Sequence, residues 1–293
     1  MGLRFDVNLS ILFTERPLLE RPAAAAKAGF SAVELWWPFP DPVPSDKDLT
    51  ALRRALENAG TQLVSLNFDA GDMASGWRGL VSLPDQADRF KANIPVAVGF
   101  ARDTGCRVLN ALYGNRIEGV DPATQDEAAM ENLALAAEAA DQVGTAVVVE
   151  ALNSHENPHY PLTSSAAAMA VVDGLRSRAI RNVALLCDVY HLARMDEDPV
   201  AVVRRYGDRI AHVQIADVPG RHQPGTGVID FPSLFSELSR IGYQGCVGCE
   251  YRPLGPSAES FAWLERAPTL PSPVHGGGEE QELPSSRREG RTT

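Results

Sequence analysis

Four apolar runs in this sequence each end on a carboxylate or an amide. Their terminal polar residues are Glu150, Asp188, Gln214 and Glu250. Apolar runs flanked by helical patterns are typical of buried parallel strands, and a barrel of such strands carries its active site at their carboxyl ends. Three carboxylates and an amide gathered there would form an oxygen-rich cage suited to a divalent cation, Mg²⁺ or Mn²⁺ rather than zinc. The pattern therefore predicts the metal site of an enzyme.

Two further side chains near these strand ends are candidates for substrate binding. His191 follows Asp188 by three residues and could bond a substrate oxygen, hold a second metal or simply pack. We favour the first role, because a neutral imidazole suits a substrate hydroxyl. Asn67, near the end of an earlier apolar run, is the second candidate.

Two other polar residues are expected to lie deeper. His212 precedes Gln214 by two residues, so both side chains face the same side of one strand. A position one layer below a ligand favours packing or support of that ligand. Glu34 lies within an apolar run, where a buried carboxylate needs a partner, and a supporting role is predicted for it too.

The elements that must position these residues alternate along the chain. Strands are predicted at 4–12, 32–37, 62–69, 107–113, 146–152, 183–190, 210–216 and 245–251. Helices are predicted at 17–28, 46–59, 84–104, 126–143, 164–176, 199–206, 231–241 and 257–266. Eight strands alternating with eight helices predict a (β/α)8 TIM barrel. A doubly wound sheet would need a glycine-rich phosphate loop after the first strand, and residues 8–13 contain no glycine.

The domain organisation follows from the composition. Residues 1–269 are predicted to form a single barrel domain, and residues 270–293, with few apolar side chains, a disordered tail without a catalytic part. Two long connections, 69–83 and 153–163, follow strands at the catalytic end and are expected to shape the pocket.

The charge and the cysteines narrow the functional classes. A net charge of −11 argues against nucleic-acid binding, which usually needs a basic surface. The sequence shows neither a membrane-length apolar run nor a signal peptide, so a cytoplasmic location without membrane association is expected. Cys246 and Cys249 have the spacing of a redox or zinc pair but lie in a predicted strand, which favours a packing role. Homo-oligomerisation stays open.

Eight short motifs, in order, resemble the hydroxypyruvate isomerases. They are RFxxNLSxLF at 4–13, AGFxAVE at 28–34, AGD at 70–72, VEALN at 149–153, DxYH at 188–191, HVQIAD at 212–217, PGTG at 224–227 and VGCEY at 247–251. That family is one of the xylose-isomerase-like barrels, which also include sugar epimerases and a DNA-repair endonuclease. The resemblance covers nearly everything except the predicted tail.

The resemblance implies roles for the four strand-end residues. Glu150, Asp188, Gln214 and Glu250 match the family's divalent-metal ligands, and Glu150 and Glu250 also match its two proton-transferring glutamates. The implied reaction interconverts hydroxypyruvate and tartronate semialdehyde through an enediolate, in carbohydrate and glyoxylate metabolism. The substrate would be a small hydroxy-oxo acid.

A carboxylate on the substrate would need a cationic partner in the pocket. Arg78, Arg221 and Arg252 are candidates, and Arg78 and Arg221 are preferred because they follow strands at the catalytic end. Other functions stay open: a 2-oxo-tetronate isomerase, a ketose 3-epimerase, and, more remotely, an abasic-site endonuclease or a non-enzymatic barrel.

Overall fold

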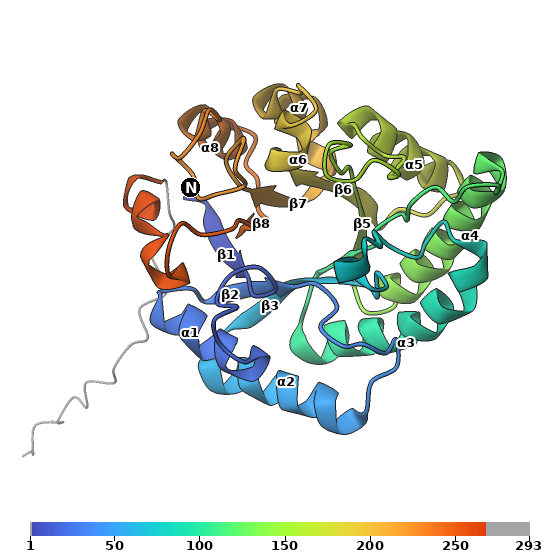
Figure 1. The fold of residues 1–293 in the computed structure, drawn as a ribbon, viewed down its shortest axis with the longest axis horizontal. Coiled ribbons are helices and arrows are strands. Elements are labelled where there is room, and N and C mark those ends of the chain that lie inside the picture. Colours follow the sequence, from blue (N-terminus) through green and yellow to red (C-terminus); the bar gives the residue numbers. More distant parts are fainter. Residues whose placement is uncertain (1, 268–293) are drawn as a thin grey trace, which may run out of the picture.

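The structure, a computed structural model that describes residues 2–267, is a closed barrel of eight parallel strands in sequence order (Figure 1). The strands are β1 Arg4–Asn8, β2 Ala32–Leu35, β3 Gln62–Asn67, β4 Val108–Asn110, β5 Ala146–Glu150, β6 Val183–Asp188, β7 Ile210–Ile215 and β8 Cys246–Cys249. Each predicted strand contains one of these, so the predicted barrel is confirmed. Closure pairs β1 with β8. The predicted tail, 270–293, lies outside the described residues.

A ring of helices covers the outside of the barrel. They are α1 Arg21–Lys27, α2 Asp46–Ala59, α3 Ala87–Thr104, α4 Pro122–Asp141, α5 Ser165–Ser177, α6 Val189–Ala193, α7 Pro199–Tyr206 and α8 Phe231–Arg240. Local chemistry sets their ends. The Ser45 side chain accepts a hydrogen bond from the Asp48 amide at the start of α2. That helix ends at Gly60, whose φ of 66° suits glycine.

The bounds of several predicted elements differ from the structure, and two of these differences have a local cause. Residues 189 and 190 begin α6 rather than end a strand, because the Asp188 carboxylate caps the helix by accepting from the His191 amide. The predicted last helix, 257–266, consists of two 3₁₀ segments, η5 Ser257–Glu259 and η6 Ala262–Arg266. Between them the Ser260 hydroxyl bonds the Ser257 carbonyl, a local contact that competes with regular helix.

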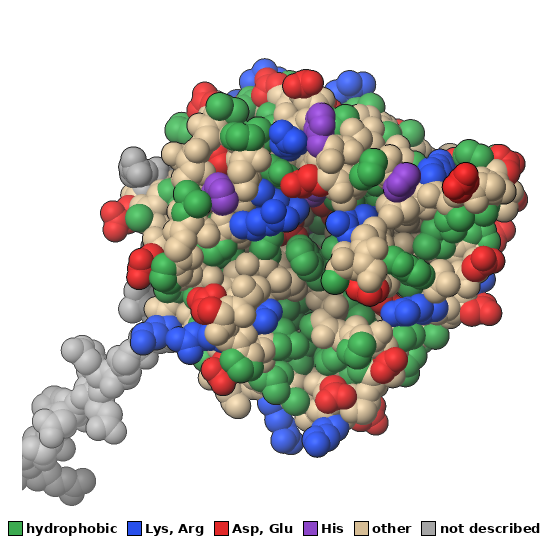
Figure 2. Space-filling view, in the orientation of Figure 1, with side chains coloured by type: hydrophobic (Ala, Val, Ile, Leu, Met, Phe, Trp, Pro, Cys, Tyr) green, Lys and Arg blue, Asp and Glu red, His purple; other side chains and the backbone are tan. Residues whose placement is uncertain are grey.

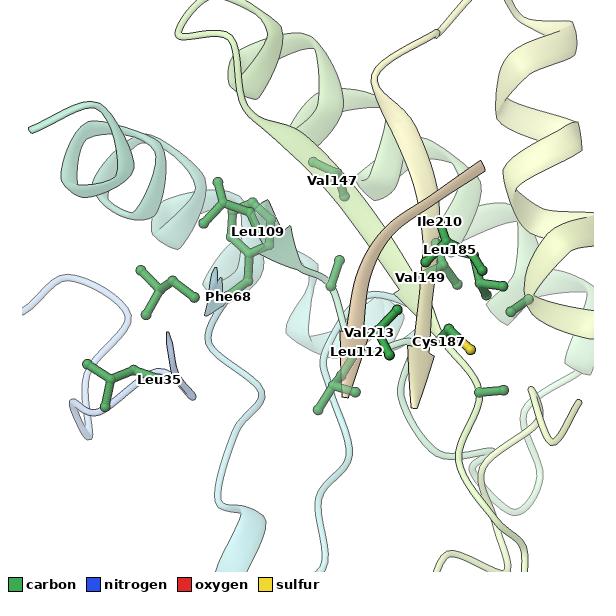
Figure 3. Packing of buried hydrophobic residues seen from close by; sticks show 14 of the residues in the cluster. Leu35, Phe68, Leu109, Leu112, Val147, Val149, Leu185, Cys187, Ile210 and Val213 are labelled. Carbon is green, nitrogen blue, oxygen red and sulfur yellow. The ribbon is translucent and has the colours of Figure 1, made fainter. Parts of the chain in front are cut away.

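The alternation of side chains along the strands separates the core into two parts. Outward-facing residues of β4 to β7 pack in the large apolar core, and Figure 3 shows several of them, including Leu109, Val147 and Leu185. Alternate residues such as Val148 and Leu186 form a smaller apolar cluster. Above it, toward the carboxyl ends of the strands, the interior becomes polar. Apolar packing therefore stabilises the barrel wall, and the polar side chains that could react lie at its mouth.

The structure bears on the cysteines and on membrane-spanning helices. All four cysteines are free and buried, and Cys246 and Cys249 belong to different apolar clusters. Their spacing therefore reflects packing, as predicted. Within residues 2–267, no helix is both long enough and apolar enough to span a bilayer.

Candidate active site

Every strand carries a buried polar side chain at or beside its carboxyl end. The eight residues are Asn8, Glu34, Asn67, Asn110, Glu150, Asp188, Gln214 and Glu250. Hydrogen bonds connect several of them across the barrel interior, so these side chains point inward rather than toward the helices. The four predicted strand-end residues are thus part of a complete polar ring.

A cavity of about 740 Å³ opens above this ring. It brings together six of the eight predicted site residues, namely Asn67, Arg78, Glu150, His191, Arg221 and Glu250. The two long connections contribute Met73, Ala74, Glu156 and Asn157, as expected for loops that shape a pocket. Figure 2 shows basic and acidic side chains gathered around a hollow near the centre of the face in view.

Three buried carboxylates converge at the mouth of the barrel. Burial, with the neighbouring Glu250 and Asp188, raises the pKa of Glu150 well above its ordinary value. Burial also raises the pKa of Asp188. For Glu250, burial outweighs the opposing effect of Arg221 and raises the pKa to about 8. Each charge makes ionisation of the others harder, so the three groups favour a cation between them.

Arg221 supplies part of that positive charge. Its Nη2 donates to Glu250 Oε2 at 2.6 Å and lies 3.8 Å from Asp188 Oδ2. Its guanidinium also lies over the Tyr190 ring, 5.1 Å from the centroid. The predicted substrate anchor therefore lies directly on two of the three carboxylates at the barrel mouth.

When all of them are ionised, the charges of Arg221 and the three carboxylates do not balance one another. Glu150, Asp188 and Glu250 carry three negative charges when ionised, and Arg221 carries one positive charge, which leaves an excess of two. A divalent cation would neutralise this excess. Gln214 Oε1 provides an independent sign of such an ion, because it is buried without a hydrogen-bond partner among the described residues. These donors fit the oxygen ligands that Mg²⁺ and Mn²⁺ prefer.

The hydrogen bonding of His191 bears on two of its predicted roles, substrate binding and ligation of a second metal. The Asn153 backbone amide donates to His191 Nδ1 at 2.9 Å, so in the neutral ring the proton is on Nε2. Burial lowers the pKa of His191 well below its usual value, which favours that neutral ring. Ligand atoms of His191, Glu150 and Asp188 lie within 4.8 Å of one another. A protonated Nε2 donates and does not ligate, so this arrangement supports substrate binding over a second metal site.

The other two predicted substrate-binding residues lie on the cavity wall. Arg78 is half-buried, and its Nη1 donates to the carbonyls of Met73, at 3.0 Å, and Trp77, at 2.6 Å. These contacts fix the guanidinium from the loop after β3. Asn67 ends β3 and is buried.

Three residues at the site were given no role from the sequence. Asn8 Nδ2 donates to both Glu250 Oε1 and Glu34 Oε1, and Asn110 Nδ2 donates to Glu150 Oε2 at 2.7 Å. Trp36 Nε1 donates to Glu250 Oε1, also at 2.7 Å. The strand-end rule that identified Glu150 would also have found Asn8 and Asn110. No sequence pattern marked Trp36.

Comparison with known proteins agrees with the barrel fold. Residues 22–267 match the family model described as "Xylose isomerase-like TIM barrel". A protein of Streptomyces coelicolor named "Putative hydroxypyruvate isomerase" is 56% identical over 265 residues, which cover 89% of this chain and 95% of that one.

The chain belongs to the hydroxypyruvate isomerase family. Among these xylose-isomerase-like barrels, the hydroxypyruvate isomerase of Escherichia coli is 32% identical, with 90% of this chain and 98% of the relative covered. A 2-oxo-tetronate isomerase of Pectobacterium atrosepticum is 33% identical, with 89% and 97% covered. The chain is therefore an isomerase of the intramolecular oxidoreductase type.

A solved member of these barrels carries a different name. The crystal structure of "AP endonuclease, family 2" from Brucella melitensis superposes with a TM-score of 0.82 at 37% identity and covers 91% of this chain and 99% of its own. The shared fold therefore spans the whole barrel. Names within the family differ, so the reaction must be argued from the site.

Proposed function

We propose that this isomerase interconverts hydroxypyruvate and tartronate semialdehyde. The observation that carries the proposal is the placement of two buried carboxyl groups with raised pKa values, Glu150 and Glu250, in one cavity with two arginines. The names of the relatives from S. coelicolor and E. coli support the same substrate.

The reaction moves a proton between adjacent carbons while a carbonyl and a hydroxyl exchange places. One glutamate removes the proton from carbon to give an enediolate, and a glutamate then returns a proton to the neighbouring carbon. The hydroxyl proton passes from one substrate oxygen to the other, so that carbonyl and hydroxyl exchange places. General acid–base groups work best when their pKa lies near the working pH. The Glu250 carboxyl, with its pKa raised to about 8, meets that condition. Asn110 and Trp36 hold the two carboxyl groups in place through their hydrogen bonds.

His191 would steady the oxygen that gains negative charge. Its Nε2–H faces the group formed by Glu150 and Asp188, and its Nδ1 is fixed by the Asn153 amide. A neutral imidazole held in this way donates a hydrogen bond without delivering a full proton. The ring is thus oriented before the substrate arrives.

Glu150, Asp188, Gln214 and Glu250 would hold the divalent cation. When bound, such an ion polarises the two substrate oxygens and stabilises negative charge on them. The orphaned Gln214 Oε1 and the two unbalanced negative charges support this ligand set.

Arg78 and Arg221 would recognise the carboxylate of the acid substrate. Arg78 is fixed on the cavity wall by backbone carbonyls, and Arg221 lies at the carboxylates themselves. A guanidinium pairs with a carboxylate through two parallel hydrogen bonds, which a neutral sugar cannot match. This placement favours an oxo acid over a ketose.

A 2-oxo-tetronate is the second candidate substrate. The cavity of about 740 Å³ has room for the additional carbon, and the P. atrosepticum relative carries that name. Both acids use the same proton transfer, so only substrate length separates the two candidates.

The test is a comparison of kcat/KM for hydroxypyruvate, a 2-oxo-tetronate and a neutral ketohexose. We expect the three-carbon acid to give the highest value and the ketohexose the lowest. Solvent deuterium should enter the substrate at the carbon that exchanges its proton. A preference for the ketohexose would replace the isomerase proposal with an epimerase, and the absence of deuterium incorporation would contradict the enediolate.

A further inference from the structure

We propose that Glu34, held in place by His212, orients the Gln214 amide so that its oxygen, and not its nitrogen, faces the metal site. This inference rests on the proposed metal-dependent function and assigns a positioning role to a residue pair that touches no substrate. The argument comes from the hydrogen bonds of three side chains below the barrel mouth.

The Gln214 amide has one arrangement that satisfies its neighbours. Its Nε2 donates to Glu34 Oε1 at 3.0 Å and lies 3.4 Å from Glu250 Oε1. The two ends of an amide have nearly the same size, but only the NH2 end can donate. A carboxylate can only accept, so Glu34 keeps the NH2 on its own side. Gln214 Oε1 is left buried and without a partner among the described residues.

Glu34 is itself held by two further donors. His212 Nε2 lies 2.6 Å from Glu34 Oε2, and Asn8 Nδ2 donates to Glu34 Oε1 at 3.1 Å. Because both Glu34 oxygens are occupied by donors, the carboxylate has little freedom to rotate. Outer groups of this kind fix the orientation of the residues that bind a metal.

The backbone is shaped to seat this pair. The register of β7 against β6 shifts just before His212, and that of β3 against β2 shifts at Glu34. Such irregularities redirect the side chains that follow them. A Cβ at Gly248 would lie 2.8 Å from Glu34 Oε1 and 3.1 Å from His212 Nε2. The pair therefore packs directly against bare backbone of β8, where a larger residue would displace it.

The geometry also argues against a second metal at the pair itself. Asp6, Glu34 and His212 place ligand atoms within 4.8 Å of one another. Glu34 already accepts from Asn8, Gln214 and His212, whereas Asp6 Oδ2 remains 4.0 Å from His212 Nε2. Glu34 and His212 thus satisfy each other, and the remaining contacts of Glu34 are with Asn8 and Gln214.

The first experiment measures Mn²⁺ binding by the purified full chain, using calorimetry and the electron paramagnetic resonance signal of the bound ion. In E34Q the amide of Gln214 can adopt either orientation. We therefore expect the dissociation constant for Mn²⁺ to rise about 10- to 100-fold, which is typical when a residue that supports a metal ligand is changed. D6N is the matched control, because Asp6 is equally buried and bonds neither Gln214 nor Glu250. We expect the dissociation constant of D6N for Mn²⁺ to stay within about twofold of wild type, because this change leaves Glu34 and His212 in place to orient Gln214.

The second experiment exchanges the two side chains. In the double variant E34Q/Q214E, the new amide at 34 can donate to the new carboxylate at 214, whose other oxygen then faces the metal site. We expect this variant to recover Mn²⁺ affinity relative to Q214E alone, which has the same charged ligand at 214 but leaves two carboxylates facing each other. A residue that merely supports the fold would show no such recovery. Circular dichroism checks folding in each case.

The outcomes separate this inference from the function on which it rests. Wild type that binds no Mn²⁺ contradicts the proposed metal site. If folded E34Q binds Mn²⁺ as tightly as wild type does, Glu34 does not orient Gln214. If E34Q does not fold, the double variant decides. A double variant that also fails to fold, or that binds Mn²⁺ at least tenfold more weakly than wild type, overturns the inference.

Discussion

Two groups of buried ionisable residues lie one above the other in this barrel and differ in almost every other respect. The mouth cluster consists of Glu150, Asp188, Glu250 and Arg221, and the deep cluster of Asp6, Glu34 and His212. Glu150, Glu250 and Arg221 line the large cavity, whereas no residue of the deep cluster does. Access to a ligand is the first difference between them.

The second difference is charge balance. In the deep cluster, burial by itself would lower the pKa of His212, but the charge and hydrogen bond of Glu34, with smaller contributions from neighbouring acids, raise it to about 9, so His212 and Glu34 form an ion pair. Burial, with the Glu34 charge, raises the pKa of Asp6 and favours its protonated form. The deep cluster is therefore neutral by itself. Once its three carboxylates are ionised, the mouth cluster has two more negative charges than positive ones, so it, and not the deep cluster, is expected to bind a cation.

Removal of divalent ions tests this difference most strongly. We expect chelation to reduce isomerisation to the background rate and Mg²⁺ or Mn²⁺ to restore it, because the mouth cluster needs its missing positive charge. Elemental analysis must show that the inactive sample is free of metal. Full turnover by a metal-free sample would contradict the metal site.

Neutralising a single carboxylate should lower activity less than removing the metal does. The loss should be large for carboxylates of the mouth cluster and small for Asp6 of the deep cluster. We expect Glu150→Gln and Glu250→Gln each to lower kcat by at least about 100-fold, as loss of a positioned acid–base group does. Both changes keep the shape of the side chain, so the melting temperature should stay nearly unchanged. The kcat of D6N should remain close to that of wild type. Equal losses of kcat in all three variants would contradict the difference between the two clusters. Deuterium exchange that continues undiminished in both glutamine variants would also contradict the assignment.

Removing a guanidinium should affect the choice of substrate more than the chemistry. We expect Arg78→Ala or Arg221→Ala to reduce the preference for hydroxypyruvate over its neutral analogue by about 10- to 100-fold, because a charge-assisted pair contributes roughly 1.5–3 kcal/mol. The measurement is the ratio of the two kcat/KM values in each variant. An unchanged ratio in both variants would mean that the carboxylate binds elsewhere.

The pH dependence of stability should give the smallest effect. Burial raises the pKa of Glu250 from its ordinary 4.5 to about 8, so the folded protein keeps a proton that the unfolded chain has lost. The stabilising contribution of the protonated Glu250 carboxyl is fully present below pH 4.5, and it is lost as the pH rises through about 8. Without metal, the melting temperature should therefore fall between pH 5 and pH 8. Added Mn²⁺ should reverse this fall, because it favours the ionised carboxylates; a melting temperature that rises with pH in chelator would contradict the sign.

Much of the barrel and part of the site followed from local patterns. Apolar runs bounded by helical segments predicted all eight strands, and the polar residue closing four of those runs located the carboxylates of the mouth cluster. The same rule applied to Val108-Leu109-Asn110 would have added Asn110. The pattern was wrong at 257–266, where serine hydrogen bonds and buried aromatic side chains override a helical spacing.

The sequence by itself determined which side chains face inward, because the two-residue period of a strand is a local property of the chain. It also determined the depth of His212 relative to Gln214, which share one strand. Only the tertiary structure decided which inward side chains meet. Asn8 reaches Glu250 across 242 positions of sequence because closure of the barrel brings β1 beside β8. Arg221 reaches Asp188 and Glu250 because it follows β7, which lies between β6 and β8. Contacts of that range depend on how every strand between them packs, and no local pattern contains that information.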